Sequence, residues 1–87
     1  MPFDSSARYR LDDQVALRPE PFGALAYHYG SRRLTFLRSG LLASVVADLG
    51  SYESVDSALE ERVPEAERAN YRRALARLES SEFIHAC

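Results

Sequence analysis

The segment from Val15 to Leu37 holds two stretches of alternating hydrophobicity joined by a tight turn, and it constrains the fold more than any other segment. Gly30 and Ser31 are the central residues of the expected turn, because glycine at the first central position favours a type II′ hairpin. This turn sets the cross-strand register. The expected pairs are Tyr29 with Arg32, His28 with Arg33, Tyr27 with Leu34, Ala26 with Thr35, Leu25 with Phe36 and Ala24 with Leu37.

The two faces of this hairpin differ in hydrophobicity. The more apolar face carries Leu25, Tyr27, Leu34 and Phe36, and we expect these four side chains to face the core. A register shift of one residue would expose all four, so the pairing is well specified. We interpret His28, on the mixed face, as a partly exposed histidine and not as a general base.

A further strand and three helices complete the predicted fold. The strand starts at Val15 and ends at Arg18, because the prolines of Pro19-Glu20-Pro21 lack the N–H group that a ladder requires. The first helix is expected at about 41–49, with Ser39 as N-cap and Gly50 as a left-handed C′ residue. The second helix is expected from Ser51 or Ser54 to Val63, and the third from about Pro64 to Ser80. The expected inward residues are Leu41, Leu42, Val45, Val46, Leu49, Val55, Ala58, Leu59, Val63, Tyr71, Ala74, Leu75 and Leu78, with Phe83 and Ile84 folding back. The fold class is therefore α+β, with a three-stranded antiparallel sheet followed by three helices.

Length and composition favour a small intracellular domain. The 87 residues support one domain, which we expect to comprise an N-terminal tail at 1–14, ordered in part by docking, and a folded region at 15–87. The formal charge is −2, and all 11 basic residues are arginine, which argues against a bulk cationic binder. A single cysteine and the lack of a signal or membrane-spanning segment predict a cytoplasmic location without membrane contact.

Residues for catalysis do not form a recognisable set. The chain has two histidines and one terminal cysteine, and the spacing of His85 and Cys87 offers two ligands where structural zinc normally needs four. Nucleotide-binding and metalloprotease motifs do not occur. We therefore expect no enzymatic activity, no metal and no cofactor.

A binding surface is the remaining candidate for function. If the strands lie in sequential order, strand 32–37 is an open edge that can accept a peptide strand, with Arg32 and Arg33 at its start. On the last helix, Ala69 and Ala76 lie between arginines on the side away from the core, which would suit an acidic peptide. Alternatively, these arginines form a solvated face paired with Glu65, Glu79 and Glu82.

The segment VALRPEPFGALAYHYGSRRLTFL closely resembles the peptide chaperones of mycofactocin biosynthesis. The later segment SVDSALEERVPEAERANYRRALARLESSEFI also fits the length and layout of that family, so the resemblance covers nearly the whole chain. This family is similar to the pyrroloquinoline-quinone chaperones, which use a winged-helix-like RiPP recognition element of three strands and three helices.

The resemblance implies a role in peptide presentation. A chaperone of this kind binds the leader of a ribosomally made precursor peptide and presents it to a radical S-adenosylmethionine (SAM) maturase, without doing chemistry itself. In related recognition elements the leader adds as an antiparallel strand to the third strand and lies against the third helix. The positions implied here are Arg32, Arg33, Leu34, Thr35, Phe36, Leu37, Ala69, Arg72, Arg73 and Ala76.

The sequence is also compatible with three different functions and with self-association. The first is that of a DNA-binding winged helix, but such a domain usually places its helices before the hairpin and carries a basic surface, whereas this chain has the opposite order and an acidic balance. We therefore expect no nucleic-acid partner. The second is that of a different protein-interaction module, and the third is that of an unrecognised enzyme. A homodimer through the same strand edge would compete with the peptide.

Overall fold

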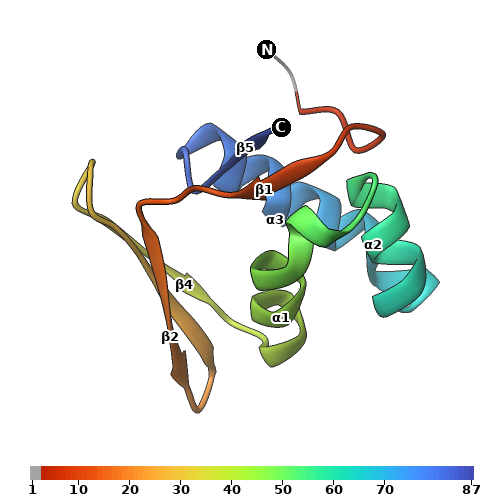
Figure 1. Ribbon diagram of the computed structural model, residues 1–87. Coiled ribbons are helices and arrows are strands. Elements are labelled where there is room, and N and C mark those ends of the chain that lie inside the picture. The colour runs from red at the N-terminus through yellow and green to blue at the C-terminus, as the bar shows by residue number, and fades with distance from the viewer. Residues whose placement is uncertain (1–2) are drawn as a thin grey trace.

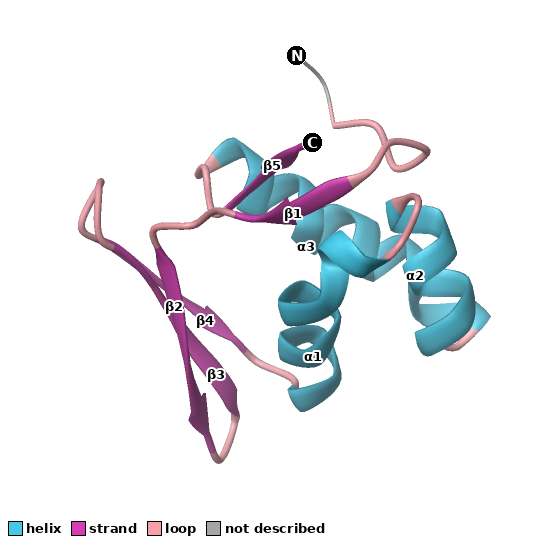
Figure 2. Ribbon diagram, viewed as in Figure 1, coloured by secondary structure: helices cyan, strands magenta, loops and turns pink. Residues whose placement is uncertain are grey.

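The computed structural model describes residues 3–87; Met1 and Pro2, the start of the expected tail, lie outside the described residues. The elements are β1 (Tyr9–Leu11), β2 (Val15–Glu20), β3 (Gly23–His28), β4 (Arg33–Leu37), α1 (Gly40–Asp48), α2 (Val55–Arg62), α3 (Arg68–Ser80) and β5 (Ile84–Ala86). Strands β2, β3 and β4 form one antiparallel sheet, and the three helices lie to one side of it (Figures 1 and 2). The predicted α+β class, with a three-stranded sheet and three helices, is confirmed.

The register of the β3–β4 hairpin is as predicted, but its turn is not. Leu25 pairs with Phe36 and His28 with Arg33, whereas the predicted pair of Tyr29 with Arg32 belongs to the loop. The type II′ prediction is wrong, because Arg32, with φ 60°, and not Gly30 takes the left-handed conformation. The Arg32 N–H donates to the carbonyl of His28 at 2.7 Å and closes a four-residue loop that preserves the register.

The faces of the sheet are reversed relative to the prediction. Ala24 and Ala26 are 3% and 1% exposed and Leu37 is buried, whereas Leu34 and Phe36 are each 58% exposed. Helix α1 packs against β3 and β4 with Val45 and Val46 in the core. We attribute the reversal to fit, because small side chains allow a helix to approach a sheet closely, so the face with alanines is the one that α1 covers.

His28 lies on this covered face and is buried, which corrects the prediction that it is partly exposed. Its Nδ1 accepts the N–H of Ser31 at 3.1 Å, and its ring meets Phe83 edge-on with centroids 5.8 Å apart. The Nε2 atoms of His28 and His85 lie 3.7 and 3.5 Å from the two carboxylate oxygens of Asp12. These contacts indicate a structural role for His28.

The ends of the helices follow the predictions with two exceptions, which are the residue after α1 and the start of α3. Helix α3 begins at Arg68, after a 3₁₀ turn at Glu65–Glu67, and not at about Pro64. Ser39 caps α1 by accepting the N–H of Leu42 at 3.1 Å, and Ser54 caps α2 by accepting the N–H of Ser57 at 3.0 Å. Gly50 is not a left-handed C′ residue, because the chain continues through a 3₁₀ turn at Leu49–Ser51. Within residues 3–87 no helix combines the length and the hydrophobicity needed to cross a membrane.

The predicted inward residues of the helices are mostly buried. Val45, Val46, Leu49, Val55, Ala58, Leu59, Val63, Leu75 and Leu78 belong to the core, and Leu42 and Tyr71 pack against it. Leu41 is 36% exposed, so its predicted inward position is wrong. Leu41 is the second residue of α1, and Gly40 before it is also exposed.

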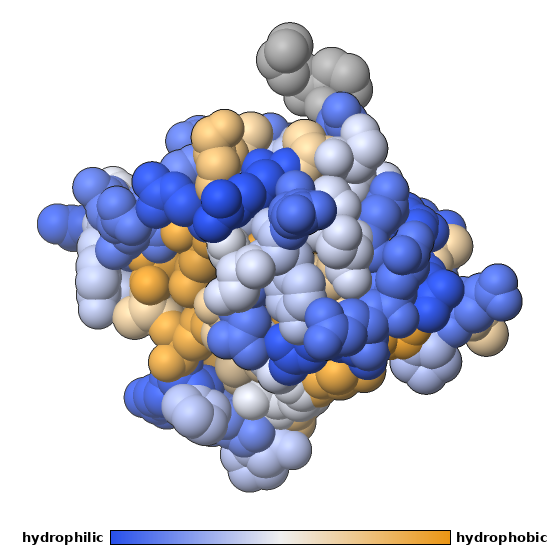
Figure 3. All heavy atoms as spheres, turned by 45° about the vertical axis from the view of Figure 1, so that its right-hand side comes forward, coloured by the Kyte–Doolittle hydropathy of each residue, from blue (hydrophilic) through white to orange (hydrophobic). Residues whose placement is uncertain are grey.

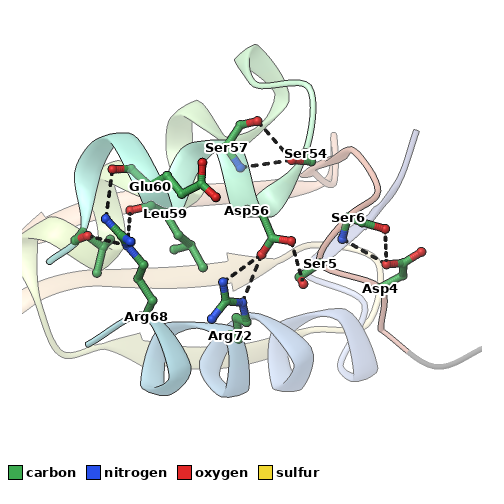
Figure 4. A network of polar contacts seen from close by, with 11 residues as sticks. Asp4, Ser5, Ser6, Ser54, Asp56, Ser57, Leu59, Glu60, Arg68 and Arg72 are labelled. Carbon is green, nitrogen blue, oxygen red and sulfur yellow. Dashed lines mark hydrogen bonds and ion pairs between the residues drawn. The ribbon is translucent and has the colours of Figure 1, made fainter. Parts of the chain in front are cut away.

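A second, two-stranded sheet ties the chain ends together. Strand β1 pairs with β5, with Tyr9 opposite Ala86 and Leu11 opposite Ile84. Phe83 and Ile84 are buried, so the prediction that they fold back onto the core is confirmed. The preceding residues also contact α2, where the Asp56 N–H donates to the Ser5 carbonyl at 2.9 Å and the Ser5 hydroxyl to the Asp56 carboxylate (Figure 4).

Gly23 offers a test of how tightly β3 packs against the end of β4. Its φ is 144°, and a Cβ there would overlap the backbone of Leu37 and Ser39. We expect Gly23→Ala to lower the free energy of unfolding by about 2 kcal/mol or more. Gly40→Ala, where no heavy atom lies within 4 Å of the added Cβ, should change it by less than about 0.5 kcal/mol. Urea denaturation followed by circular dichroism measures both, and equal stabilities would contradict the packing described.

His28 provides a second test of the fold. We expect His28→Ala to lower the free energy of unfolding by about 1–3 kcal/mol, because packing against Phe83 and the acceptor for Ser31 are lost. His85→Ala, at a half-buried position on β5, should cost less than about 0.5 kcal/mol. The same denaturation measurement compares them, and a His28→Ala protein as stable as wild type would rule out the structural role.

Candidate functional site

Strand β4 is an open edge of the three-stranded sheet, as the order β2-β3-β4 places it. An edge strand has backbone N–H and C=O groups without a partner strand, and these can pair with an added peptide. Strand β2 forms the other edge, and the prediction that it ends at Arg18 is wrong, because it runs to Glu20 with Pro19 opposite Ala24. Pro19 cannot donate a hydrogen bond. Between the two edges, β4 is therefore the better acceptor for an added strand.

A groove of about 130 Å³ lies directly beside this edge. Its lining residues come from β4, α1 and α3 and are Thr35, Phe36, Leu37, Leu42, Ala74, Arg77 and Leu78. Five of these side chains are apolar, and Arg77 is the one charged residue in the lining. The groove thus combines an apolar floor, an open strand edge and one guanidinium.

The predicted strand residues divide between the groove and the solvent. Thr35, Phe36 and Leu37 line the groove, and Leu37 is buried at its base. Arg32, Arg33 and Leu34 are exposed and lie outside the lining. The structure therefore brings half of the predicted strand residues to the groove.

The predicted helix residues Ala69, Arg72, Arg73 and Ala76 do not line the groove. Arg72 forms an ion pair with Asp56 of α2 at 3.0 Å, and Arg73 donates to Asn70 within α3 (Figure 4 shows Arg72). Arg68 is also engaged, because it donates to the carbonyls of Leu59, Glu60 and Val63 at the end of α2. These arginines largely connect α3 to α2, as the carbonyls at a helix end require partners.

The groove residues of α3 carry a signal in the sequence that a simple division into buried and exposed faces misses. Ala74, Arg77 and Leu78 are spaced three and four residues apart, so they share one side of the helix. Ala74 and Leu78 belong to the predicted core stripe, and Arg77 lies at its border. The groove thus runs along the boundary between the buried and exposed sides of α3.

A second groove, of about 220 Å³, flanks the opposite edge of the sheet. It is lined by Leu17, Pro19, Gly23, Ala24, Ala43, Ser44 and Ala47, from β2, β3 and α1. Hydrophobic residues gather on the left-hand part of the face drawn in Figure 3, whereas hydrophilic residues cover most of the rest. Because Pro19 interrupts the donors of this edge, the second groove is less suited to strand addition.

The described residues offer no metal centre, since no three histidine, cysteine or carboxylate side chains among them are placed to hold an ion. His85 and Cys87, the pair considered from the sequence, lie at the end of β5 and beyond it. The groove beside β4 is therefore the candidate site, and its components suit binding of an extended peptide.

Comparisons with known proteins show the family of this chain. The model of the "Peptide chaperone MftB family" matches residues 8–85. Proteins named "Peptide chaperone MftB" from Mycobacterium ulcerans, Mycobacterium tuberculosis and Mycolicibacterium smegmatis are 43%, 41% and 42% identical over 83 residues. The aligned region covers 94% of this chain and 76%, 76% and 81% of those relatives. No solved structure matches this chain significantly. The chain belongs to the MftB peptide chaperone family, which confirms the resemblance noted from its sequence.

Proposed function

We propose that this protein is a peptide chaperone of mycofactocin biosynthesis that binds the leader of a ribosomally made precursor peptide. The leader adds as an antiparallel strand to β4, and the chaperone presents the bound peptide to a radical SAM maturase. The observation that carries this proposal is the apolar groove that lies directly beside the open edge of β4. Membership of the family supports it.

Strand addition explains how such a site would bind a peptide. Backbone hydrogen bonds to β4 supply affinity for any extended segment, whereas pockets select every second side chain. Leu37, Leu42 and Leu78 would receive apolar leader residues, and Arg77 would pair with a carboxylate of the leader. A leader with alternating apolar residues and an acidic residue near Arg77 fits best.

The chaperone itself contributes no catalytic step in this proposal, and it needs no cofactor. Buried His28 is held by Ser31 and Phe83, and the Nε2 atom of His85 lies 3.5 Å from a carboxylate oxygen of Asp12. Chemistry on the peptide belongs to the maturase, and the chaperone lowers the cost of ordering the leader by offering a preformed edge. We propose a cytoplasmic location, where such a maturase would meet both proteins.

The placement of the leader on α3 has two versions. The groove places it over Ala74, Arg77 and Leu78, whereas the family resemblance placed it over the outer side, at Ala69, Arg72, Arg73 and Ala76. We favour the groove, because Arg72 is engaged by Asp56 and would have to leave an ion pair to contact the peptide. The strand positions Arg32 to Leu37 are common to both versions.

Isothermal titration with the small precursor peptide encoded near this protein tests the proposed function. We expect saturable binding to the full peptide and none to the same peptide without its leader. Amide exchange should slow in the complex at every second residue of Arg33–Leu37, because those N–H groups point away from β3 and gain partners in the added strand. No binding at high micromolar concentration in low salt would contradict the proposal. Strong weakening by salt together with binding to duplex DNA would instead favour a DNA-binding winged helix.

Two charge reversals on α3 distinguish the versions of the site. Arg77 lines the groove, whereas Arg73 is exposed outside it, so the two form a matched pair on one helix. We expect Arg77→Glu to weaken leader binding about tenfold or more and Arg73→Glu to change it less than about threefold. The opposite result would place the leader on the outer side of α3. Circular dichroism of both variants controls for folding.

A further inference from the structure

The outer face of the three-stranded sheet is left uncovered by the helices, which pack on the opposite face (Figure 1). Most of the exposed large hydrophobic side chains belong to the two hairpins of this sheet. They are Phe22 (44% exposed), Tyr29 (59%), Leu34 (58%) and Phe36 (58%). A single exposed apolar side chain is common on protein surfaces, but a contiguous group on one sheet face is typical of an interaction surface.

A pocket of about 270 Å³ lies within this group. It is lined by Phe22, Phe36 and Arg38. The two phenylalanine rings meet edge-on, with centroids 5.6 Å apart and planes at 76°. Phenylalanine and arginine are both enriched in protein interfaces relative to the rest of the protein surface. This pocket suits an apolar side chain flanked by a carboxylate.

The charge of the sheet differs in sign from the rest of the protein. Residues 15–38 contain four arginines and one glutamate, a formal charge of +3. The remaining residues contain seven arginines and twelve acidic side chains, a formal charge of −5. Glu20 accepts from Arg18 at 2.7 Å. Arg33 lies opposite His28 on the covered face, so Arg32 in the loop and Arg38 after β4 supply the basic rim of the outer face. A complementary partner has an apolar centre and an acidic rim.

The outer face adjoins the peptide groove, because Phe36 lines both pockets. A strand added to β4 extends the sheet, and every second side chain of that strand points to the outer face. Those side chains would lie beside Leu34 and Phe36. The outer face is thus a surface on which the chaperone and a bound leader can be contacted together.

We propose that this outer sheet face, anchored at the pocket of Phe22, Phe36 and Arg38, docks the peptide-modifying maturase, which contributes an apolar side chain within an acidic patch. The identity of the partner rests on the proposed function. A second copy of this chain is disfavoured, because two copies meeting through this face would place two basic rims opposite each other. Nucleic acid is disfavoured by the apolar centre and by the overall charge of −2.

Phe22→Ser tests the docking surface without touching the peptide groove, because Phe22 lies between β2 and β3 and outside the groove lining. Binding of the purified maturase is measured by biolayer interferometry, with and without peptide, and leader affinity by fluorescence anisotropy. We expect Phe22→Ser to weaken maturase binding about tenfold or more and to leave leader affinity within about twofold. Leu41→Ser, which removes a comparable exposed side chain from α1, should change neither.

Arg38→Glu and Arg38→Lys examine the basic rim by a second route. We expect Arg38→Glu to weaken maturase binding more at low salt than at high salt, because salt screens the charge contribution. We expect Arg38→Lys to retain most of the maturase binding, because the lysine keeps the charge. Circular dichroism verifies the fold of every variant.

Several outcomes would overturn the docking proposal. The first is that the wild-type protein does not bind the maturase, or that Phe22→Ser and Arg38→Glu leave this binding unchanged. The second is that Phe22→Ser lowers leader affinity as much as maturase affinity. The third is that another partner occupies the face, shown by duplex DNA that displaces the maturase or by a wild-type dimer that Phe22→Ser dissociates. Failure of the proposed function has a different signature. If maturase binding depends on Phe22 while the leader does not bind, the docking surface stands and leader binding by the chaperone is rejected.

Discussion

Close packing of α1 against the alanine-bearing face of β3 determines how both faces of the sheet are used. Ala24 and Ala26 are almost fully buried beneath this helix, next to Val45 and Val46. Their small side chains allow the close approach, and the larger Leu34 and Phe36 are turned to the opposite side as a consequence of the two-residue period of a strand. One packing choice therefore creates both the covered face of the sheet and its exposed apolar face.

The position of α3 beside the sheet edge depends on contacts made by segments distant in sequence. Asp56 of α2 accepts hydrogen bonds from Ser5 and Arg72, so the N-terminal segment, α2 and α3 meet at one carboxylate (Figure 4). The β1–β5 pair holds the chain that follows α3. The carboxylate of Asp48 accepts a hydrogen bond from Arg62, which joins α1 to α2 and raises the pKa of that guanidinium. The groove exists because these contacts place α3 next to β4.

The two proposed binding surfaces of this protein differ in chemistry. The groove beside β4 offers backbone groups, an apolar floor and one guanidinium, which suit an extended peptide. The outer face offers aromatic side chains with a basic rim, which suit a folded acidic surface. Phe36 belongs to both, so a peptide in the groove and a protein on the outer face would be neighbours. This arrangement is consistent with a protein that brings two partners together.

Strands β2, β3 and β4 and the three helices are predicted from the sequence alone, because periodicity and caps act over a few positions, whereas β1 and β5 are not predicted. The hairpin register, the cap Ser39 and most of the helical core are predicted correctly in this way. For α2 the sequence left the start open between Ser51 and Ser54, and the structure has Ser54 as the cap. The sequence does not reveal which hairpin face is covered, which of Gly30 and Arg32 is left-handed, or that β1 pairs with β5. The family resemblance implies an α3 side of the site at Ala69, Arg72, Arg73 and Ala76, and the sequence does not show that the groove is lined by Ala74, Arg77 and Leu78. These features are set by tertiary packing, since each depends on how closely two distant segments can approach, and hydrophobicity along a chain carries no information on that fit.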